Sequence, residues 1–305
     1  MTATHGAADE VELVERLDAA YDPSRFQAIV IDDEGAFWEP SPLLHAQAGR
    51  RPPVVVLVNT QQANRFLPWI EQLEAVHVMQ DDNVQRFNDL HVTLCKLSSG
   101  DIFGIEKYFA WGAREQAMTL RGSDERDGLY DALDDFTARL CVHGRLRALA
   151  LTVLDEFVSN ALYNAPVDAS GAQRFRDLHR ATPVSLSDDE HIGVRFCADG
   201  RRLGLSVVDP FGSLKMESLR GTLVRGLRRG AQRWDRATGG AGLGFYCAFE
   251  SLSHLVVNVA PGRRTELIGI LALRDTYREF LVSGKSLNMF TAPTTGSAVG
   301  AEVEP

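Results

Sequence analysis

Residues 145–166 read RLRALALTVLDEFVSNALYNAP. Apolar residues recur in this stretch at intervals of three and four, which predicts one long helix with a single buried stripe. Glu156, Asn160 and Asn164 are spaced by four and therefore share one face of that helix. Their oxygens are hard ligands of the kind that magnesium prefers, and amide N–H groups donate to phosphate. Taken alone, such a triplet is more often a solvated helix face.

The bulk composition is that of an ordinary globular protein. The chain has 305 residues, enough for two domains, with 45% hydrophobic and 24% charged residues. A net charge of −9 gives no overall field that favours nucleic acid or an anionic membrane. The four cysteines form no CxxC pair, which argues against a metal cluster and fits a reducing compartment. No signal peptide and no membrane-spanning run is visible, so a cytoplasmic protein is expected.

The first 115 residues are expected to form an N-terminal α/β domain. Runs with strand character alternate with a helical stretch, as in an α/β layer. The aromatic segment 101–112 (DIFGIEKYFAWG) is expected to cover its own sheet, a more common role than seating a partner. The predicted elements are helices over residues 10–20 and 62–73 and strands over residues 27–31, 54–58 and 91–97.

Polar residues occur at or near the ends of the predicted N-terminal strands. Asp32 and Asp33 end the first strand, Asn59 and Thr60 end the second, and Lys96 lies in the third. This pattern faintly resembles a phosphoreceiver domain, in which an acidic pair, an acceptor Asp, a Ser or Thr and a Lys meet at the strand ends. Because the acceptor position holds an Asn, a degenerate receiver-like sensory or docking module is expected in place of a working receiver.

Residues 116–128 are polar and contain glycines, as expected of a linker, and a second domain is predicted over residues 129–290. The Asp199-Gly200 pair between two alternating runs is a strong signal for a β-hairpin. Helices on one face of a mostly antiparallel sheet are therefore expected, followed by a disordered tail over residues 291–305. The predicted elements are helices over residues 131–140, 146–165 and 245–252 and strands over residues 191–197, 202–208, 255–259 and 265–273.

Two motifs in the second domain suit a ligand. Asp209 follows a strand in VVDPFGS, where its carboxylate can accept a hydrogen bond from a ligand amine. Taken alone, it is more often a residue that opens a turn. The segment 239–245 (GGAGLGF) places Gly240, Gly242 and Gly244 before a helix, so backbone can approach an anion closely there. An isolated GxGxG is a weak signal, and the absence of a preceding parallel strand argues against a dinucleotide fold.

Six arginines lie between these two motifs in an otherwise acidic protein. Guanidinium groups bind phosphate in bidentate fashion, so one interpretation is a lid that faces phosphate. The other interpretation is a solvated helix face. The residues are Arg220, Arg225, Arg228, Arg229, Arg233 and Arg236.

The order of these motifs resembles the GHKL ATPase superfamily, which includes gyrase, histidine kinases, chaperones and mismatch-repair ATPases. Residues 129–283 carry the resemblance. EFVSNALYNA is similar to the N box of that superfamily, which implies that Asn160 coordinates magnesium and that Asn164 contacts phosphate. The resemblance thus implies ATP and Mg²⁺ as cofactors and an α/β sandwich of the GHKL, or Bergerat, type.

The remaining motifs fit the same superfamily. VVDPFGS is similar to the first glycine box, which implies that Asp209 reads the adenine amine and that Gly212 lies at the nucleotide. Thr265 stands where the family often has a hydroxyl near the adenine. GAGLGF is similar to the second glycine box, whose backbone wraps the phosphates through Gly240, Gly242, Leu243 and Gly244.

Within the superfamily, FTARLCVHGRLRALALTVLDEFVSNA resembles the anti-sigma-factor serine kinases. This resemblance implies that Glu156 is the base that activates the accepting hydroxyl and that the partner belongs to a sigma/anti-sigma system. In the histidine-kinase branch the partner is a response regulator, and dimers are common among such proteins. His143 is followed by Gly144 and lacks the context of a phosphoacceptor, so it is interpreted as structural.

One departure from the family's motifs separates two hypotheses about function. The family's first glycine box reads DxGxG, whereas here Phe211 and Ser213 occupy the two glycine positions. The first hypothesis is an ATP-dependent protein kinase whose N-terminal domain binds the partner or signal. The second is a non-catalytic nucleotide-sensing scaffold, which Phe211 and the missing acceptor histidine favour.

Overall fold

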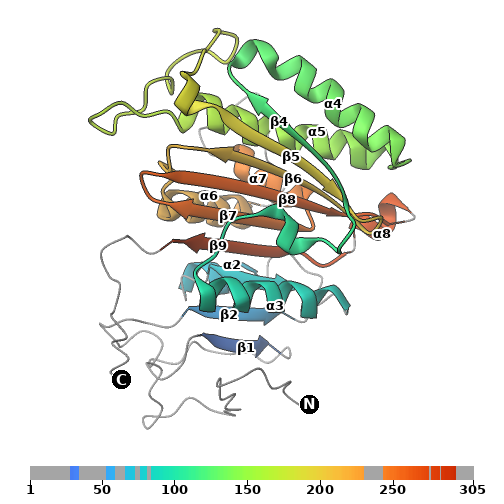
Figure 1. Cartoon of the computed structure of the whole chain (residues 1–305). Coiled ribbons are helices and arrows are strands. Elements are labelled where there is room, and N and C mark those ends of the chain that lie inside the picture. The colour runs from blue at the N-terminus through green and yellow to red at the C-terminus, as the bar shows by residue number, and fades with distance from the viewer. Residues whose placement is uncertain are drawn as a thin grey trace, which may run out of the picture.

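The computed structural model describes residues 28–33, 53–58, 66–72, 76–80, 84–229, 243–274, 276–281 and 283–292. Its centre is one mixed nine-stranded sheet with the order β1-β2-β3-β9-β7-β8-β6-β5-β4 (Figure 1). β1, β2 and β3 are parallel, whereas β7, β8, β6, β5 and β4 form an antiparallel series. The strands are β1 Ile29–Asp33, β2 Val54–Val58, β3 His77–Gln80, β4 Arg114–Leu120, β5 Ile192–Ala198, β6 Arg202–Asp209, β7 His254–Ala260, β8 Arg264–Ala272 and β9 Ser286–Thr291.

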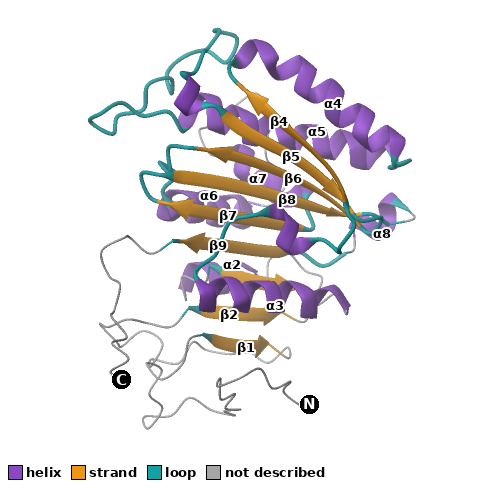
Figure 2. Ribbon diagram, viewed as in Figure 1, coloured by secondary structure: helices purple, strands orange, loops and turns teal. Residues whose placement is uncertain are grey.

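Helices cover both faces of the sheet (Figure 2). Residues of α2 and α4 to α7 share one apolar core with one face, and α3 and a short 3-10 turn pack on the other. The helices of the region predicted as a second domain therefore lie on one face, as predicted, and the elements that cover the other face come from the first 115 residues. The helices are α2 Phe66–Gln72, α3 Val84–Ser99, α4 Arg126–Arg139, α5 Gly144–Ser159, α6 Met216–Arg229, α7 Leu243–Ser251 and α8 Tyr277–Leu281, and the turn that packs beside α3 is Ile105–Tyr108.

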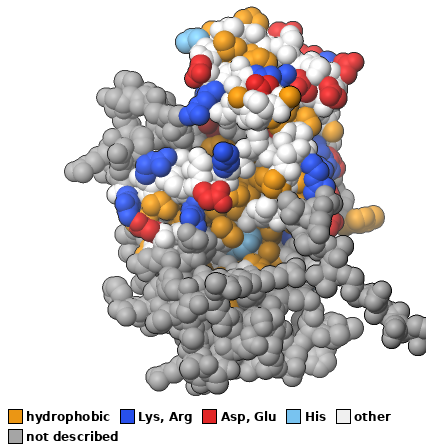
Figure 3. All heavy atoms as spheres, turned by 90° about the vertical axis from the view of Figure 1, so that its left-hand side faces the viewer, with side chains coloured by type: hydrophobic (Ala, Val, Ile, Leu, Met, Phe, Trp, Pro, Cys, Tyr) orange, Lys and Arg blue, Asp and Glu red, His pale blue; other side chains and the backbone are white. Residues whose placement is uncertain are grey.

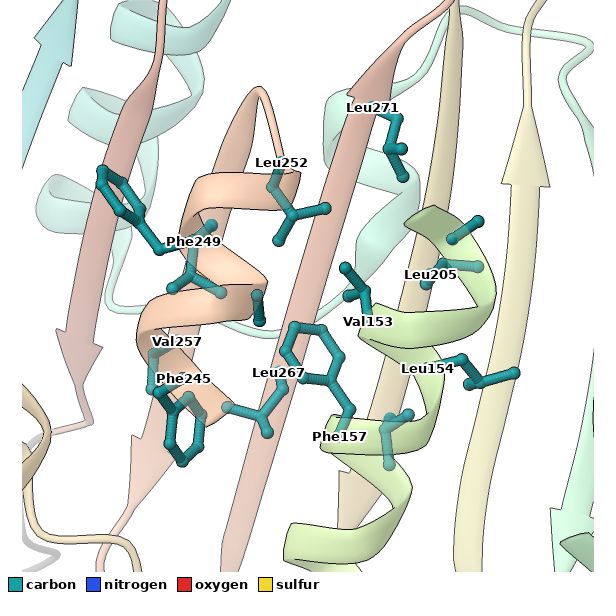
Figure 4. Close-up of a cluster of buried hydrophobic side chains, with 14 of the residues drawn as sticks. Val153, Leu154, Phe157, Leu205, Phe245, Phe249, Leu252, Val257, Leu267 and Leu271 are labelled. Carbon is teal, nitrogen blue, oxygen red and sulfur yellow. The ribbon is translucent and has the colours of Figure 1, made fainter. Parts of the chain in front are cut away.

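The predicted apolar stripe of the long helix forms the centre of the main core. Phe157 of α5 points toward α7 over β8, near Leu267, and Phe249 of α7 packs in the same core (Figure 4). Each of these side chains is at most 2% exposed. Burying one large apolar side chain contributes roughly 1.5–3 kcal/mol, so this layer fixes α5 and α7 against β6 to β8.

The predicted hairpins are confirmed. β5 and β6 pair antiparallel with Val194 opposite Val207. Gly200 in the connecting turn has a φ of +85°, a conformation that residues with a side chain rarely adopt. β7 and β8 form the second antiparallel hairpin. None of the helices in the described part of the chain has the length and apolarity that a membrane crossing requires.

The strand predicted over residues 91–97 is wrong, because these residues lie in helix α3. Leu90, Leu94 and Leu97 recur at helical spacing and pack on β2 and β3. The third strand of the parallel part is instead β3, which the sequence analysis did not predict. Lys96 is therefore a helical residue and does not complete a receiver-like arrangement at the strand ends. Asn59 and Thr60 lie outside the described residues, as do the helix predicted over residues 10–20 and nearly all of the predicted tail.

The linker predicted over residues 116–128 is also wrong. Residues 114–120 form β4, which pairs along its whole length with β5, and α4 begins at Arg126. β4 is an edge strand with many exposed positions, so its polar residues had the appearance of a loop. β9 pairs with both β3 and β7, so one sheet contains strands from both of the predicted domains.

The aromatic segment 101–112 covers its own sheet, as predicted. Ile105 and Tyr108 are buried against β5, β7, β8 and β9. Phe109 and Ile105 lie so close to the backbone of Gly204 in β6 that a Cβ atom there would overlap the Phe109 ring. Trp111, in contrast, is fully exposed.

Beneath α3 and this segment lies a buried polar network. Lys96 Nζ donates to Tyr108 Oη at 2.9 Å and to Asn258 Oδ1 at 3.0 Å. Asn258 in turn donates to Glu266, whose carboxylate also accepts from the Gly104 backbone N–H at 2.8 Å and from a serine hydroxyl of β6. Burial lowers the pKa of Lys96 to about 7, a shift that Glu266 opposes. Charged groups therefore hold this layer on the sheet.

A second polar chain lies beside the first. Asp89 of α3 accepts from Arg202 at 2.8 Å and lies 3.4 Å from His254 Nδ1. Asn288 joins His254 to His77, with nitrogen–nitrogen and nitrogen–oxygen distances of 2.6 and 3.0 Å. Burial lowers the pKa of His77 to about 4, so this ring is neutral at physiological pH. This series of polar contacts connects α3 to four strands that are far apart in the sequence.

Glu266→Ala is expected to destabilise the fold by about 3 kcal/mol, because it leaves three buried donors without their acceptor and removes the carboxylate charge near Lys96. Urea denaturation followed by circular dichroism measures the free energy of unfolding. Glu115→Ala is the control, since the Glu115 carboxylate pairs with Arg195 at the surface and its loss is expected to change stability by less than about 1 kcal/mol. Equal effects of the two variants would contradict the role assigned to the network.

Candidate functional site

The end of α5 carries the predicted triplet. α5 passes at Asn160 into a π-helical turn, Asn160–Asn164, closed by a bond of 2.9 Å from the Ala165 N–H to the Asn160 carbonyl. π turns are rare and occur often at functional sites. The Asn164 side-chain amide donates to Asn160 Oδ1 at 3.3 Å, so the two amides lie on one side of the turn. Asn160 is only 6% exposed.

Glu156 lies one turn before these amides, against the start of α7. Its carboxylate occupies the space that a side chain at Gly244 would need. Gly244 is the second residue of α7, and the free N–H groups of a helix N-terminus favour an anion there. The carboxylate lies 3.9 Å from Arg180 Nη1 and its side chain is 21% exposed. Burial raises the pKa of Glu156; Arg180 opposes this shift and Asp155 adds to it.

Asp209 ends β6 and is 3% exposed. Its Oδ1 accepts hydrogen bonds from the backbone N–H groups of Phe211 at 3.0 Å and Gly212 at 3.3 Å. Burial raises the pKa of Asp209 to about 6 in spite of these bonds. Thr265 pairs with Asp209 in the β6–β8 register and its hydroxyl helps to lower that pKa, although it makes no hydrogen bond of normal geometry among the described residues.

The loop after Asp209 joins it to the end of α5. Ser213 Oγ donates to the Ala165 carbonyl at 2.7 Å, next to Asn164. Gly212 has a φ of +58°, and its backbone packs so closely on the turn at residues 260–264 that a Cβ atom would overlap the Ala260 carbonyl. The turn thus requires this glycine, whether or not a ligand approaches it.

Phe211 stands at the first position where the sequence departs from the motif that it resembles. Its side chain is buried, and the guanidinium of Arg174 lies 5.8 Å from the centre of its ring. Arg174 also pairs with Glu190 at 2.7 Å. Phe211 therefore lies beside the loop of residues 166–187, which carries Arg174.

That loop is a part of the site that the sequence analysis missed. The Tyr163 hydroxyl lies 2.8 Å from the Arg180 carbonyl and 3.2 Å from that of Thr182, and donates to them, while the Gln173 side chain donates to the Asn164 carbonyl at 2.6 Å. Figure 3 shows the side of the molecule where this loop and the β7–β8 turn lie, and Lys and Arg side chains are spread across its described part. The basic run RFRDLHR of residues 174–180 was the available sequence signal.

The predicted lid arginines are described only in part. Arg220, Arg225, Arg228 and Arg229 lie in α6, whereas Arg233 and Arg236 lie outside the described residues. The Arg228 guanidinium pairs with Glu71 of α2, and Arg225 donates to the Thr222 hydroxyl at 2.9 Å. These two arginines therefore make contacts within the protein.

The structure brings most of the predicted site residues together and leaves some undescribed. Glu156 lies against Gly244, Asn160 and Asn164 follow it in the π turn, and the Ser213–Ala165 hydrogen bond brings the Asp209 loop next to that turn. His143 accepts from the Arg145 N–H as the N-cap of α5, which agrees with its structural interpretation. Gly240 and Gly242 lie outside the described residues, and the Leu243 side chain is not described.

Comparison with known proteins assigns the chain to no family. No protein-family model matches the chain, and no curated protein is significantly similar to it. The geometry of the site must therefore carry the functional argument.

The donor set suits magnesium held jointly with phosphate. Within the described residues, no three His, Cys, Asp or Glu side chains form a cluster that could hold a metal ion alone. Mg²⁺ usually takes one or two protein oxygens and completes its shell with water and phosphate oxygens. Asn160 Oδ1 accepts one hydrogen bond, from Asn164, and so has a lone pair left for a metal, and Glu156 supplies negative charge one turn away.

Proposed function

We propose that the chain binds Mg-ATP in a site of the GHKL type and that it transfers the terminal phosphoryl group. The observation that carries the proposal is the convergence of three separate segments. The N-box turn at Asn160, the loop after Asp209 and the start of α7 at Gly244 lie together through the Ser213–Ala165 hydrogen bond and the Glu156–Gly244 contact. A carboxylate, two amides and a helix N-terminus in one place suit a metal-bound polyphosphate.

The adenine end of the proposed site is Asp209. Its Oδ1 is already engaged by two backbone N–H groups, so Oδ2 is the oxygen that accepts the adenine amine. Thr265, buried beside it, has a hydroxyl that can bond to the base or to a bridging water. Burial disfavours the ionised form of Asp209, so an uncharged residue at this position would give a more stable fold. The presence of a carboxylate here is therefore better explained by ligand binding than by stability.

The phosphate end is the N-box turn. Asn160 would hold magnesium and Asn164 would donate to a phosphate oxygen, with the backbone at Gly244 facing the anion. When bound, magnesium would neutralise the negative charge that develops on the phosphate oxygens.

Glu156 is the proposed base. The hydroxyl oxygen of a partner serine, or of water, attacks the γ-phosphorus and gives its proton to the Glu156 carboxylate. The bond between the γ-phosphorus and the oxygen that joins it to the β-phosphate breaks, and ADP leaves with that oxygen. A raised pKa suits this role, since it strengthens the base relative to an exposed glutamate.

The partner is proposed to be a protein, as in the anti-sigma-factor serine kinases or the two-component systems. In the first case it belongs to a sigma/anti-sigma system, and in the second it is a response regulator. The parallel strands β1 to β3 would form the sensory or docking part. A homodimer is compatible with either case.

A non-catalytic nucleotide-sensing scaffold is the second candidate. The observation that favours it is the buried Phe211 ring at the first glycine position. Gly212 beside it packs on the β7–β8 turn, so the loop has fewer positions at which its backbone can approach a base. A scaffold would bind nucleotide without turnover and would signal through contacts with its partner.

The test is titration calorimetry with ATP and Mg²⁺, together with phosphate release from labelled ATP. Asn160→Ala is expected to weaken magnesium-dependent ATP binding by roughly tenfold or more, because it removes a metal ligand. Asn88→Ala, an exposed site on α3, is the control and is expected to have no effect. Binding without turnover would favour the scaffold, whereas an unchanged affinity of the Asn160 variant would exclude its role as a ligand.

A further inference from the structure

The loop of residues 166–187 brings one arginine to the candidate base. The Arg180 backbone is anchored through its carbonyl to the Tyr163 hydroxyl at 2.8 Å. Its guanidinium reaches Glu156, with Nη1 at 3.9 Å from Oε2. The anchor lies next to the N-box amides, so the position of this side chain is tied to the proposed phosphate end of the site.

The contact between the two side chains is loose. A separation of 3.9 Å is an ion pair without a hydrogen bond. Among the described residues, the guanidinium makes no hydrogen bond, and its side chain is 53% exposed. Its N–H donors are thus available to an incoming anion. Arg174 differs, since it pairs with Glu190 at 2.7 Å and lies over two aromatic rings.

A terminal phosphate is a stronger partner for this guanidinium than Glu156 is. It carries more charge and offers oxygens that match the planar fork of an arginine. We propose that Arg180 binds the terminal phosphate of the nucleotide and that it leaves Glu156 to do so. This inference rests on the proposed function and names the residue that distinguishes ATP from ADP.

The exchange has a consequence for the base. The pairing with Arg180 lowers the pKa of Glu156, whereas burial and Asp155 raise it. When Arg180 moves to the phosphate, the carboxylate loses its opposing cation and becomes a stronger base. The base is thus strongest when a triphosphate is bound.

The experiment compares the affinities of the whole protein for ATP and ADP, each with Mg²⁺, by titration calorimetry. Arg180→Ala is expected to weaken ATP binding by roughly 10- to 100-fold and to change ADP binding by less than about threefold. Arg180→Lys is expected to retain part of the preference, because the charge remains without the planar fork. Arg201→Ala, an exposed arginine at the opposite end of β6 from Asp209, is the control.

The outcomes separate the two proposals. If the wild-type protein binds neither nucleotide, the proposed function fails and this inference fails with it. If the wild-type protein prefers ATP and Arg180→Ala either keeps the preference or loses affinity for both nucleotides equally, only the role of Arg180 is overturned. Circular dichroism of each variant distinguishes a loss of binding from a loss of fold.

Discussion

Glu156→Gln is expected to leave the affinity for Mg-ATP within about threefold of wild type and to slow turnover by a factor of roughly 10² to 10⁴. Glutamine has the same shape, so it can keep the contact with the Gly244 backbone and the packing of α5 on α7. It cannot accept a proton from the attacking hydroxyl. Phosphate release from labelled ATP, or transfer to a partner once one is known, measures the loss, and calorimetry measures the binding.

If Glu156 is the base, the variant must lose turnover while it keeps its affinity for Mg-ATP. Equal losses of binding and turnover would show that Glu156 supports the shape of the site and is not the base. Glu279→Gln in α8, an exposed position, is the matched control and should leave both unchanged. Full turnover of the Glu156 variant would require another base.

Asp209→Asn is expected to stabilise the fold and to weaken nucleotide binding by roughly 100-fold. Burial raises the pKa of Asp209 from its ordinary value of 3.8 to about 6, so between these values the folded state holds a proton that the unfolded state has lost. The free energy of unfolding therefore falls by about 3 kcal/mol as the pH rises from about 4 to about 6, and stays lowered above that range. Asparagine does not ionise, so the variant should gain about that amount at pH 8 and nothing at pH 4.

The loss of binding has a separate cause. In the Asp209→Asn variant, the side-chain carbonyl oxygen would accept the N–H groups of Phe211 and Gly212, so the side-chain amide would point its own N–H toward the adenine amine. Two donors would then oppose each other, which weakens binding by roughly 100-fold. Urea denaturation at pH 4 and pH 8, with calorimetry at pH 8, measures both effects. Asp131→Asn on the exposed face of α4 is the control.

Each half of this prediction can fail separately. A variant that is no more stable at pH 8 would show that Asp209 is not penalised by burial. A variant that is more stable and still binds ATP would leave the burial argument intact and remove Asp209 from adenine recognition.

The sequence predicted the elements whose signals are local. The intervals between Leu149, Val153 and Phe157 are sufficient to predict α5, and the Asp199-Gly200 pair is sufficient for the β5–β6 hairpin. The same local order placed Glu156 and Asn160 one turn apart on a continuous helical segment, although the α-helix ends at Ser159 and Asn160 begins the π turn. The α/β class and the antiparallel sheet followed from these elements.

The elements that the sequence did not predict depend on distant partners. α3 buries Asp89, Thr93 and Lys96. Arg202, which donates to Asp89, and Asn258, which accepts from Lys96, are both more than a hundred positions away. No local pattern shows that such residues will be buried, and the β-branched run that includes Thr93 favours a strand. The sequence did not predict Arg180 as a site residue for the same reason, because its partner Glu156 lies on the preceding helix, beyond a long loop.

The position of β9 has a consequence for synthesis. β9 is the last strand of the described chain, yet it lies between β3 and β7 and provides the hydrogen bonds that attach β1 to β3 to the rest of the sheet. On the ribosome, the first three strands therefore emerge long before their attachment exists, and the open edge of β3 stays unpaired until residue 291 has left the exit tunnel. Assembly of the full sheet therefore has a long loop to close, which makes this step slow.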